Sequence, residues 1–213
     1  MAEFWFKRAA DQGLPKAMHN LGVLAVRADR DGSAEKWFQA AAARGWINST
    51  VALGVLLEEG GRVEEAMQLY ETAAAKGNAD AQDRLGQRAM DLDTEEGYAK
   101  ARYWSELAAA QGHPGGDTNL GTIYHEGLGV ERDPKRAVSH FLRAARSGHR
   151  GARFWLAVAY EVGRGVELDR IESAYWYSQV ADENEQARYM LMRLELSPDE
   201  KAALEARLQQ ATH

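Results

Sequence analysis

The chain alternates short amphipathic stretches with breaks that contain glycine. In one stretch, Ala137, Phe141, Ala144 and Ala145 follow the i, i+4, i+7 and i+8 spacing of a single helix face. A glycine follows each such stretch, at a place where a left-handed residue can end a helix without a Cβ clash. The pattern therefore predicts an all-α protein built from short helices, with no contribution from β-sheet.

We expect thirteen helices, and the last of them starts at a recognisable cap. Ser197 is its predicted N-cap and Glu200 lies three residues further on, as in a capping box. A largely polar final helix of this kind is typical of the end of a repeat array. The predicted ranges are 2–12, 17–28, 33–43, 49–59, 62–75, 79–91, 95–111, 117–126, 134–146, 151–162, 170–182, 185–195 and 198–211.

The helical stretches belong to a repeat. An Ala-Ala pair lies four and three residues before a glycine in five places, and these glycines are 32, 32, 35 and 36 residues apart. They are Gly13, Gly45, Gly77, Gly112 and Gly148. Eight residues after each of them comes a leucine followed by a small residue. These pairs are Leu21-Gly22, Leu53-Gly54, Leu85-Gly86, Leu120-Gly121 and Leu156-Ala157. A period of this length indicates an array of stacked helix pairs.

The glycine of each Leu-Gly pair lies in the middle of a predicted helix, where glycine costs about 1 kcal/mol relative to alanine. We expect a bulky aromatic side chain of the partner helix to pack over it, because close approach of two helices would explain the repeated cost. Aromatic residues are usual eight residues before the repeat glycine, at Trp5, Trp37 and Trp104. Their helical spacing beside the Ala-Ala pairs predicts that these tryptophans lie in the core.

Two joints between predicted helices carry a further motif. One runs from Tyr124 through Gly127 and Gly129 to Asp133, and the other runs from Tyr160 through Gly163 and Gly165 to Asp169. Together with the Leu-Gly and Ala-Ala-Gly positions, this pattern resembles the Sel-one-like repeat (SLR) family, a relative of the tetratricopeptide repeats. The resemblance covers nearly the whole chain, although the shorter units at Leu21 and Leu53 lean toward the tetratricopeptide version.

The resemblance implies a right-handed superhelix of helix pairs with a concave inner face. We therefore expect one solenoid over residues 1–213, with a half repeat at 1–16 and a capping helix at 197–213. Phe4, Trp5 and Phe6 fall in that half repeat, where they would have little to pack against. This edge is expected to self-associate or to pack against an upstream segment.

Composition narrows the function classes. The 213 residues include no cysteine, which excludes disulfides, cysteine nucleophiles and thiolate metal sites but leaves cytoplasm and periplasm equally open. The formal net charge of −6 argues against a nucleic-acid partner or an anionic membrane. No apolar run approaches the ~20 residues of a membrane span, and the first residues lack a signal-peptide core. We expect a soluble protein, and the SLR resemblance implies a bacterial protein of the cytoplasm, periplasm or cell envelope.

Residues that could carry out catalysis have simpler structural interpretations. The two Gly-x-Gly joints could be phosphate-binding turns, but neither has the third glycine or a preceding strand, so we interpret them as turns of the repeat. His113 and His149 occupy the same loop position one repeat apart, which favours a repeat residue over a metal ligand. No common hydrolase or nucleotide-binding motif is present. We predict no enzyme activity, no cofactor and no metal site.

The candidate binding residues come from the resemblance, which implies that the first helix of each pair lines the concave face. The exposed positions flank the Leu-Gly pair. The Asp, Glu, Lys and Arg residues among them are six acids and one base, Arg27. An acidic protein would also show acids on any face, so this excess has two interpretations. The predicted partner-binding residues are Val55, Glu58, Glu59, Asp83, Gln87, Asp91, Thr122, His125, Glu126, Phe154, Val158 and Glu161. Val23 and Val26 occupy the same register in the first repeat.

The resemblance implies a non-enzymatic adaptor or scaffold that binds a protein or peptide, and the acidic positions favour a partner with basic residues. The alternative is an inhibitor, since some SLR proteins act as immunity partners of secreted toxins such as a type VI secretion phospholipase. An enzyme with an unrecognised loop site is the third hypothesis. The sequence does not identify the partner.

Overall fold

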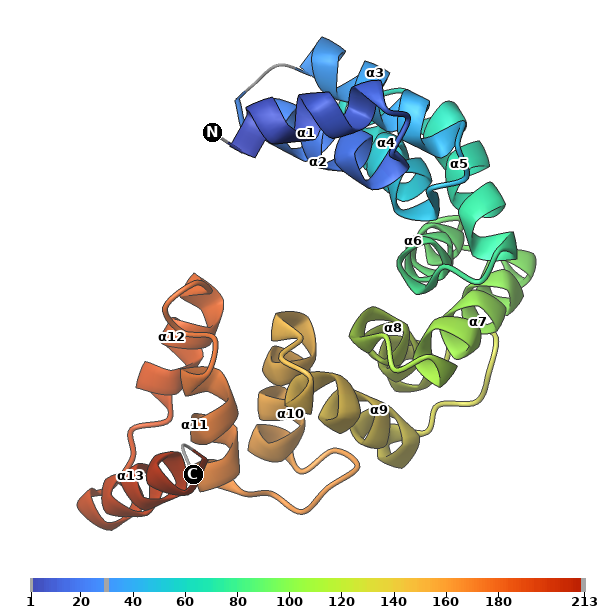
Figure 1. Ribbon diagram of the computed structural model, residues 1–213. Helices are drawn as coiled ribbons and strands as arrows, with labels where there is room; N and C mark the ends of the chain where they lie inside the picture. The colour runs from blue at the N-terminus through green and yellow to red at the C-terminus, as the bar shows by residue number, and fades with distance from the viewer. Residues whose placement is uncertain (1, 29–30, 212–213) are drawn as a thin grey trace. The chain divides into compact units, whose positions relative to one another are not determined.

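The computed structural model describes residues 2–28 and 31–211, and every regular element in those ranges is an α-helix (Figure 1). The all-α prediction is confirmed. The helices are α1 (Ala2–Asp11), α2 (Pro15–Val26), α3 (Asp31–Ala42), α4 (Ile47–Glu59), α5 (Val63–Ala75), α6 (Ala79–Met90), α7 (Glu95–Ala110), α8 (Pro114–Glu126), α9 (Pro134–Arg146), α10 (Arg150–Val162), α11 (Arg170–Ser178), α12 (Glu185–Arg193) and α13 (Pro198–Ala211).

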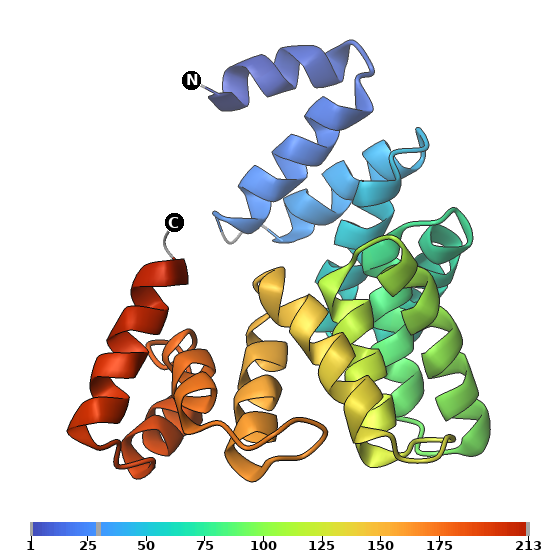
Figure 2. The ribbon, with the colours of Figure 1, turned by 90° about the horizontal axis from the view of Figure 1, so that it is seen from below.

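The chain packs as two units, residues 1–85 and 86–213, and the boundary falls inside α6. In unit 1, each helix from α1 to α4 packs on the next along the chain. In unit 2, the same consecutive packing runs from α7 to α12, and α13 returns to pack on α11 (Figure 2). Helix pairs stacked in chain order are what the repeat predicted.

An aromatic ring covers the glycine of the Leu-Gly pair in three repeats. A Cβ atom built on Gly22, Gly54 or Gly121 would lie 2.4–2.5 Å from a ring atom of the following helix. The rings belong to Phe38, Tyr70 and Phe141. A side chain at these positions would therefore clash with the ring unless the two helices moved apart. The predicted close approach is confirmed.

The tryptophans were expected in the core, and this prediction is wrong for Trp5. The ring that covers each glycine lies seven residues before the repeat glycine, one residue after the tryptophan position. One residue turns a helix by about 100°, so the tryptophan points to the side of the contact. Trp37 and Trp104 are half-buried, and Trp5 is 58% exposed.

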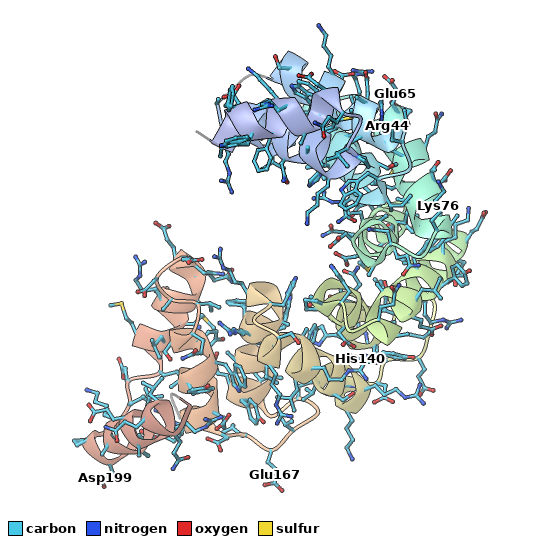
Figure 3. All side chains as sticks on the ribbon, viewed as in Figure 1. Arg44, Glu65, Lys76, His140, Glu167 and Asp199 are labelled. Atoms are coloured by element: carbon cyan, nitrogen blue, oxygen red, sulfur yellow. The ribbon has the colours of Figure 1, made fainter. Side chains whose placement is uncertain are left out.

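The glycines of the joints act as turn residues. Gly127 and Gly163 end α8 and α10 in the left-handed conformation, with φ of 78° and 66°. Gly165 lies so close to the start of α9 that a Cβ atom there would be 2.2 Å from the carbonyl oxygen of Pro134. Both observations agree with a structural interpretation of the Gly-x-Gly joints. Glu167 projects from the joint between α10 and α11 (Figure 3).

The two ends of the chain differ in packing. In α1, Phe6 packs against the buried cluster that contains Ala10, whereas Phe4 and Trp5 are each 58% exposed. The expectation that all three rings lack packing is therefore wrong for Phe6. The predicted capping box is present in α13: Ser197 N donates to Glu200 Oε2 at 2.8 Å, and Glu200 N donates to Ser197 Oγ at 3.2 Å.

Among the described helices, none combines the length and apolar character needed to cross a membrane.

Candidate interaction surface

Unit 1 contains a cleft with a volume of about 350 Å³ between α2, α3 and α4. Its lining is mainly apolar, with one exposed cation and one exposed anion, Arg27 and Glu59. The lining residues are Val23, Val26, Arg27, Phe38, Ala52, Val55, Leu56 and Glu59. The repeat register placed five of them, Val23, Val26, Arg27, Val55 and Glu59, on the exposed face of the first helices.

The sequence analysis missed three lining residues, Phe38, Ala52 and Leu56. Phe38 belongs to the second helix of its pair, which was not expected to reach this face. It is 3% exposed and packs over Gly22, so its ring closes the cleft from beneath. An aromatic residue recurs seven residues before the repeat glycine at Phe38, Tyr70 and Phe141, and this recurrence was the available signal.

Glu58 precedes the cleft residue Glu59 in the sequence, but its carboxylate bonds to other residues of unit 1. The hydroxyl of Tyr70 donates to Glu58 Oε2 at 2.9 Å, and Arg84 Nη1 donates to the same oxygen at 3.0 Å. The Glu58 side chain is only 14% exposed. Its carboxylate therefore serves α4, α5 and α6 and offers little charge to a partner.

Glu161 occupies the equivalent position in unit 2 and has the same kinds of partner. The hydroxyl of Tyr177 donates to Glu161 Oε2 at 2.8 Å, and Arg193 Nη2 donates to Oε1 at 2.7 Å. Burial, together with this carboxylate, raises the pKa of Tyr177 above its usual range. The Tyr-Glu-Arg arrangement is thus a structural feature that occurs in both units.

Two further predicted acids also have arginine partners. Asp91 lies 3.5 Å from Arg88, and Glu126 lies 3.8 Å from Arg132. Asp83 is half-buried. Among the described residues, Glu59 is the one predicted acid of this face whose side chain has no partner in the same chain. The unneutralised negative charge on this face is therefore smaller than the sequence suggested.

Two of the other predicted residues of unit 2, His125 and Phe154, form aromatic contacts. The ring of His125 lies 5.3 Å from that of Trp155, which is 36% exposed and was not predicted. Phe154 meets Tyr177 edge to face at 5.7 Å. Thr122 bonds to the backbone of its own helix, Val158 is half-buried and Gln87 is exposed. The repeat register identified Phe154 but not Trp155, which follows it directly in the sequence.

The described parts of the chain contain no group of three or more metal-ligating side chains that could hold an ion. The candidate surface of unit 1 is thus an apolar cleft with Arg27 and Glu59 at its lining, and the candidate surface of unit 2 is an area of partly exposed aromatic side chains. These features suit binding by contact area and charge.

The family comparison agrees with the helix pairs just described. The model of the Sel1 repeat matches residues 1–14, 15–46, 49–78, 79–113, 117–149 and 151–185. The chain belongs to the Sel1 repeat family. The resemblance stated from the sequence is thus confirmed. A search of curated proteins gives no significant match.

Solved structures of Sel1 repeat proteins share the fold. The protective antigen c5321 of uropathogenic Escherichia coli is 27% identical with a TM-score of 0.87, over 98% of this chain and 47% of its own. A Sel1 repeat protein from Oxalobacter formigenes is 28% identical with a TM-score of 0.77, over 91% and 59%. The immunity protein Pa5087 of Pseudomonas aeruginosa is 21% identical with a TM-score of 0.61, over 83% and 71%. The chain spans about half the length of the first two.

Proposed function

We propose that this Sel1 repeat protein is a non-catalytic scaffold that binds a protein partner through the exposed face of its first helices. The cleft of unit 1 carries the proposal, because repeat positions assigned to a binding face line an apolar cavity there. An aliphatic or aromatic side chain of the partner would fill the cleft above Phe38 and between Val23, Val26 and Val55. Burial of such an anchor is the usual source of affinity in a small interface.

The charges of the cleft specify the partner further. Glu59 lines the cleft without a side-chain partner among the described residues, so a lysine or arginine next to the apolar anchor would meet an available carboxylate. Arg27 lines the same cleft and would favour an acidic or polar group at the other end of the bound segment. Opposite charges at two places select the direction of the bound peptide.

In unit 2 we propose a second contact surface on the predicted positions. Phe154, Val158 and the exposed Trp155 would supply apolar area, and Glu126, whose carboxylate lies 3.8 Å from Arg132, would supply a polar contact. The proposed surface of unit 2 also includes Gln87, Asp91, Thr122, His125 and Glu161. Glu58 and Asp83 are the predicted residues of unit 1 that lie outside the cleft lining.

A random peptide library displayed on phage tests the cleft with the protein as it exists. Peptides selected on the wild-type chain are expected to carry an apolar residue beside lysine or arginine. Glu59→Lys should reverse that preference and weaken binding of a wild-type-selected peptide about tenfold. The matched control is Glu71→Lys, which changes the same charge at an exposed position on α5. It should select the same peptides as the wild type.

The cleft proposal would be wrong if Glu59→Lys and Glu71→Lys changed the selected peptides equally, or if neither variant changed them. Selection of peptides without any apolar anchor would also contradict it. Because both substitutions lie on exposed positions, each variant should keep its stability within about 0.5 kcal/mol, which thermal unfolding checks.

Inhibition of a toxin is the second candidate function, and the fold permits it, since the immunity protein Pa5087 has the same fold. Such an inhibitor would use the same contact surface against an enzyme.

Self-association through the exposed rings of Phe4 and Trp5, which lie under the Arg8 guanidinium, is a further proposal for the α1 edge. Analytical ultracentrifugation of the wild type and Trp5→Ala over a concentration series tests this self-association.

A further inference from the structure

A second cavity, with a volume of about 300 Å³, lies in unit 2 between α9, α10, α11 and α13. None of the predicted partner-binding residues lines it. Three arginines line it, one from each of α9, α10 and α13, together with a single acid from α11. These are Arg146, Arg153, Arg207 and Glu172. A concentration of positive charge is unusual in a chain whose net charge is −6.

The one carboxylate of the cavity is already engaged at both oxygens. Arg207 Nε donates to Glu172 Oε1 at 2.5 Å, and the indole nitrogen of Trp176 donates to Oε2 at 3.1 Å. The guanidinium of Arg207 also stacks on Tyr175 at 4.0 Å. Within the described ranges, neither Arg146 nor Arg153 forms an ion pair with any carboxylate. The cavity therefore has two cationic groups whose charge the chain does not neutralise.

Comparison of neighbouring repeats shows that residues of opposite charge occupy the same position at the centre of this site. The position five residues after the repeat glycine is Asp117 in one repeat and Arg153 in the next. Asp117 is buried and accepts hydrogen bonds from Arg143 Nε at 3.1 Å and from His140 Nδ1, which lies 2.9 Å away. His140 lies on α9, next to α8 (Figure 3).

The partners change together with the central residue. The positions equivalent to His140 and Arg143 are Trp176 and Gln179, which are neutral. Arg153 instead donates from Nε to the carbonyl of Ala145 at 3.2 Å and from Nη1 to the carbonyl of Gln179 at 3.5 Å. The charge at the centre is thus inverted, and within residues 2–28 and 31–211 no carboxylate pairs with Arg153 in place of the missing counter-ion.

The remaining lining limits the size and kind of ligand. Tyr160 and Leu142 are half-buried, and they offer aromatic and aliphatic surface next to the arginines. A volume of this size is at the low end of small-molecule sites. A planar guanidinium pairs best with a planar oxyanion that can accept two hydrogen bonds.

We propose that this cavity binds a carboxylate carried on a small apolar group, with the oxyanion between Arg146 and Arg153 and the apolar group against Tyr160. Two sources share that chemistry: a free organic acid, and an aspartate or glutamate side chain of a bound protein. The site is independent of the unit 1 cleft and does not require that proposal.

The test is an NMR titration of the full chain with phenylacetate, and with phenylacetamide as its uncharged counterpart. Phenylacetate should bind and shift the resonances of α9, α10 and α11, whereas phenylacetamide should bind at least tenfold more weakly. Arg153→Gln should weaken phenylacetate at least tenfold. The fold should tolerate this change, because Gln82 at the equivalent position makes the corresponding bond to Ala74 O at 3.2 Å.

Arg146→Gln is the second variant, on an exposed side chain, and should weaken binding several-fold. The matched control is Arg44→Gln, which removes the same charge from an exposed position in unit 1 and should change nothing. N-acetylglutamate amide distinguishes the sources. Tighter binding than phenylacetate supports a protein side chain, and weaker binding supports a free acid.

The proposal is overturned if phenylacetamide binds as well as phenylacetate, or if Arg44→Gln weakens binding as much as Arg153→Gln. It is also overturned if phenylacetate produces no shifts in α9 to α11. Equal affinity for inorganic phosphate would overturn the assignment to a carboxylate on an apolar group.

Discussion

One residue along a helix decides which side chain covers each mid-helix glycine. Trp37 and Phe38 are adjacent and both aromatic, yet only the ring of Phe38 lies over Gly22. The period of the repeat identified the glycine and the need for a covering ring. It could not choose between neighbouring aromatic residues, because the choice depends on the rotation of α3 about its own axis.

Gly121 offers the clearest test of this contact. Gly121→Leu should lower the free energy of unfolding by about 2–3 kcal/mol, because the ring of Phe141 is buried and cannot move aside. Gly32→Leu is the control, since a Cβ atom there meets nothing within 4 Å, and it should stay within about 0.5 kcal/mol. Urea denaturation of both variants measures the difference. A neutral Gly121→Leu would show that the helices do not need this close approach.

The same scale explains why the charge of the first-helix face was overestimated. The sequence assigned Glu58 and Glu161 to that face. Their arginine partners lie 26 and 32 residues further along the chain, so no local pattern reveals the ion pairs. Glu59, one residue from Glu58, has no such partner among the described residues. Whether a carboxylate is available to a ligand thus depends on tertiary contacts.

At the level of helices, the starts of α9 and α11 were predicted to the residue, because an aspartate cap marks each of them. Asp133 and Asp169 cap α9 and α11 with their side chains, as aspartate does at many helix starts. Pro114 begins α8 three residues before the expected start. Proline lacks a backbone N–H, and the first turn of a helix does not need one. The end of α11 was placed four residues too late, because Gln179 and Val180 continue as turns.

Helix α13 is expected to stabilise unit 2. Leu204 and Leu208 pack against the buried cluster that contains Tyr175, and Arg207 is bonded to Glu172. Truncation after Leu196 removes these contacts, so it should lower the melting temperature and expose apolar surface of α11. Differential scanning calorimetry and binding of a hydrophobic dye measure the two effects. An unchanged melting temperature together with unchanged dye binding would contradict a capping role.

For the molecule as a whole, the repeat period predicted the helix pairs, and the two glycine joints together with the Leu-Gly and Ala-Ala-Gly positions indicated the family. A repeat array is read from local spacing, since each unit contacts its neighbours in the chain. The cleft in unit 1 was predicted in part, through residues of α2 and α4, whereas its floor at Phe38 was not. The cationic cavity of unit 2 was not predicted, because it combines residues of four helices. One continuous solenoid over 1–213 remains a prediction.

The most direct test of the proposed function is hydrogen–deuterium exchange of the full chain with and without a library-selected peptide. Binding in the cleft should slow exchange in α2 and α4, whose residues line it, and leave the exposed side of α5 unchanged. The Glu59→Lys variant should lose this protection, and Glu71→Lys should keep it. Protection confined to α5, or protection in the wild type that Glu59→Lys retains, would contradict binding through the first-helix face.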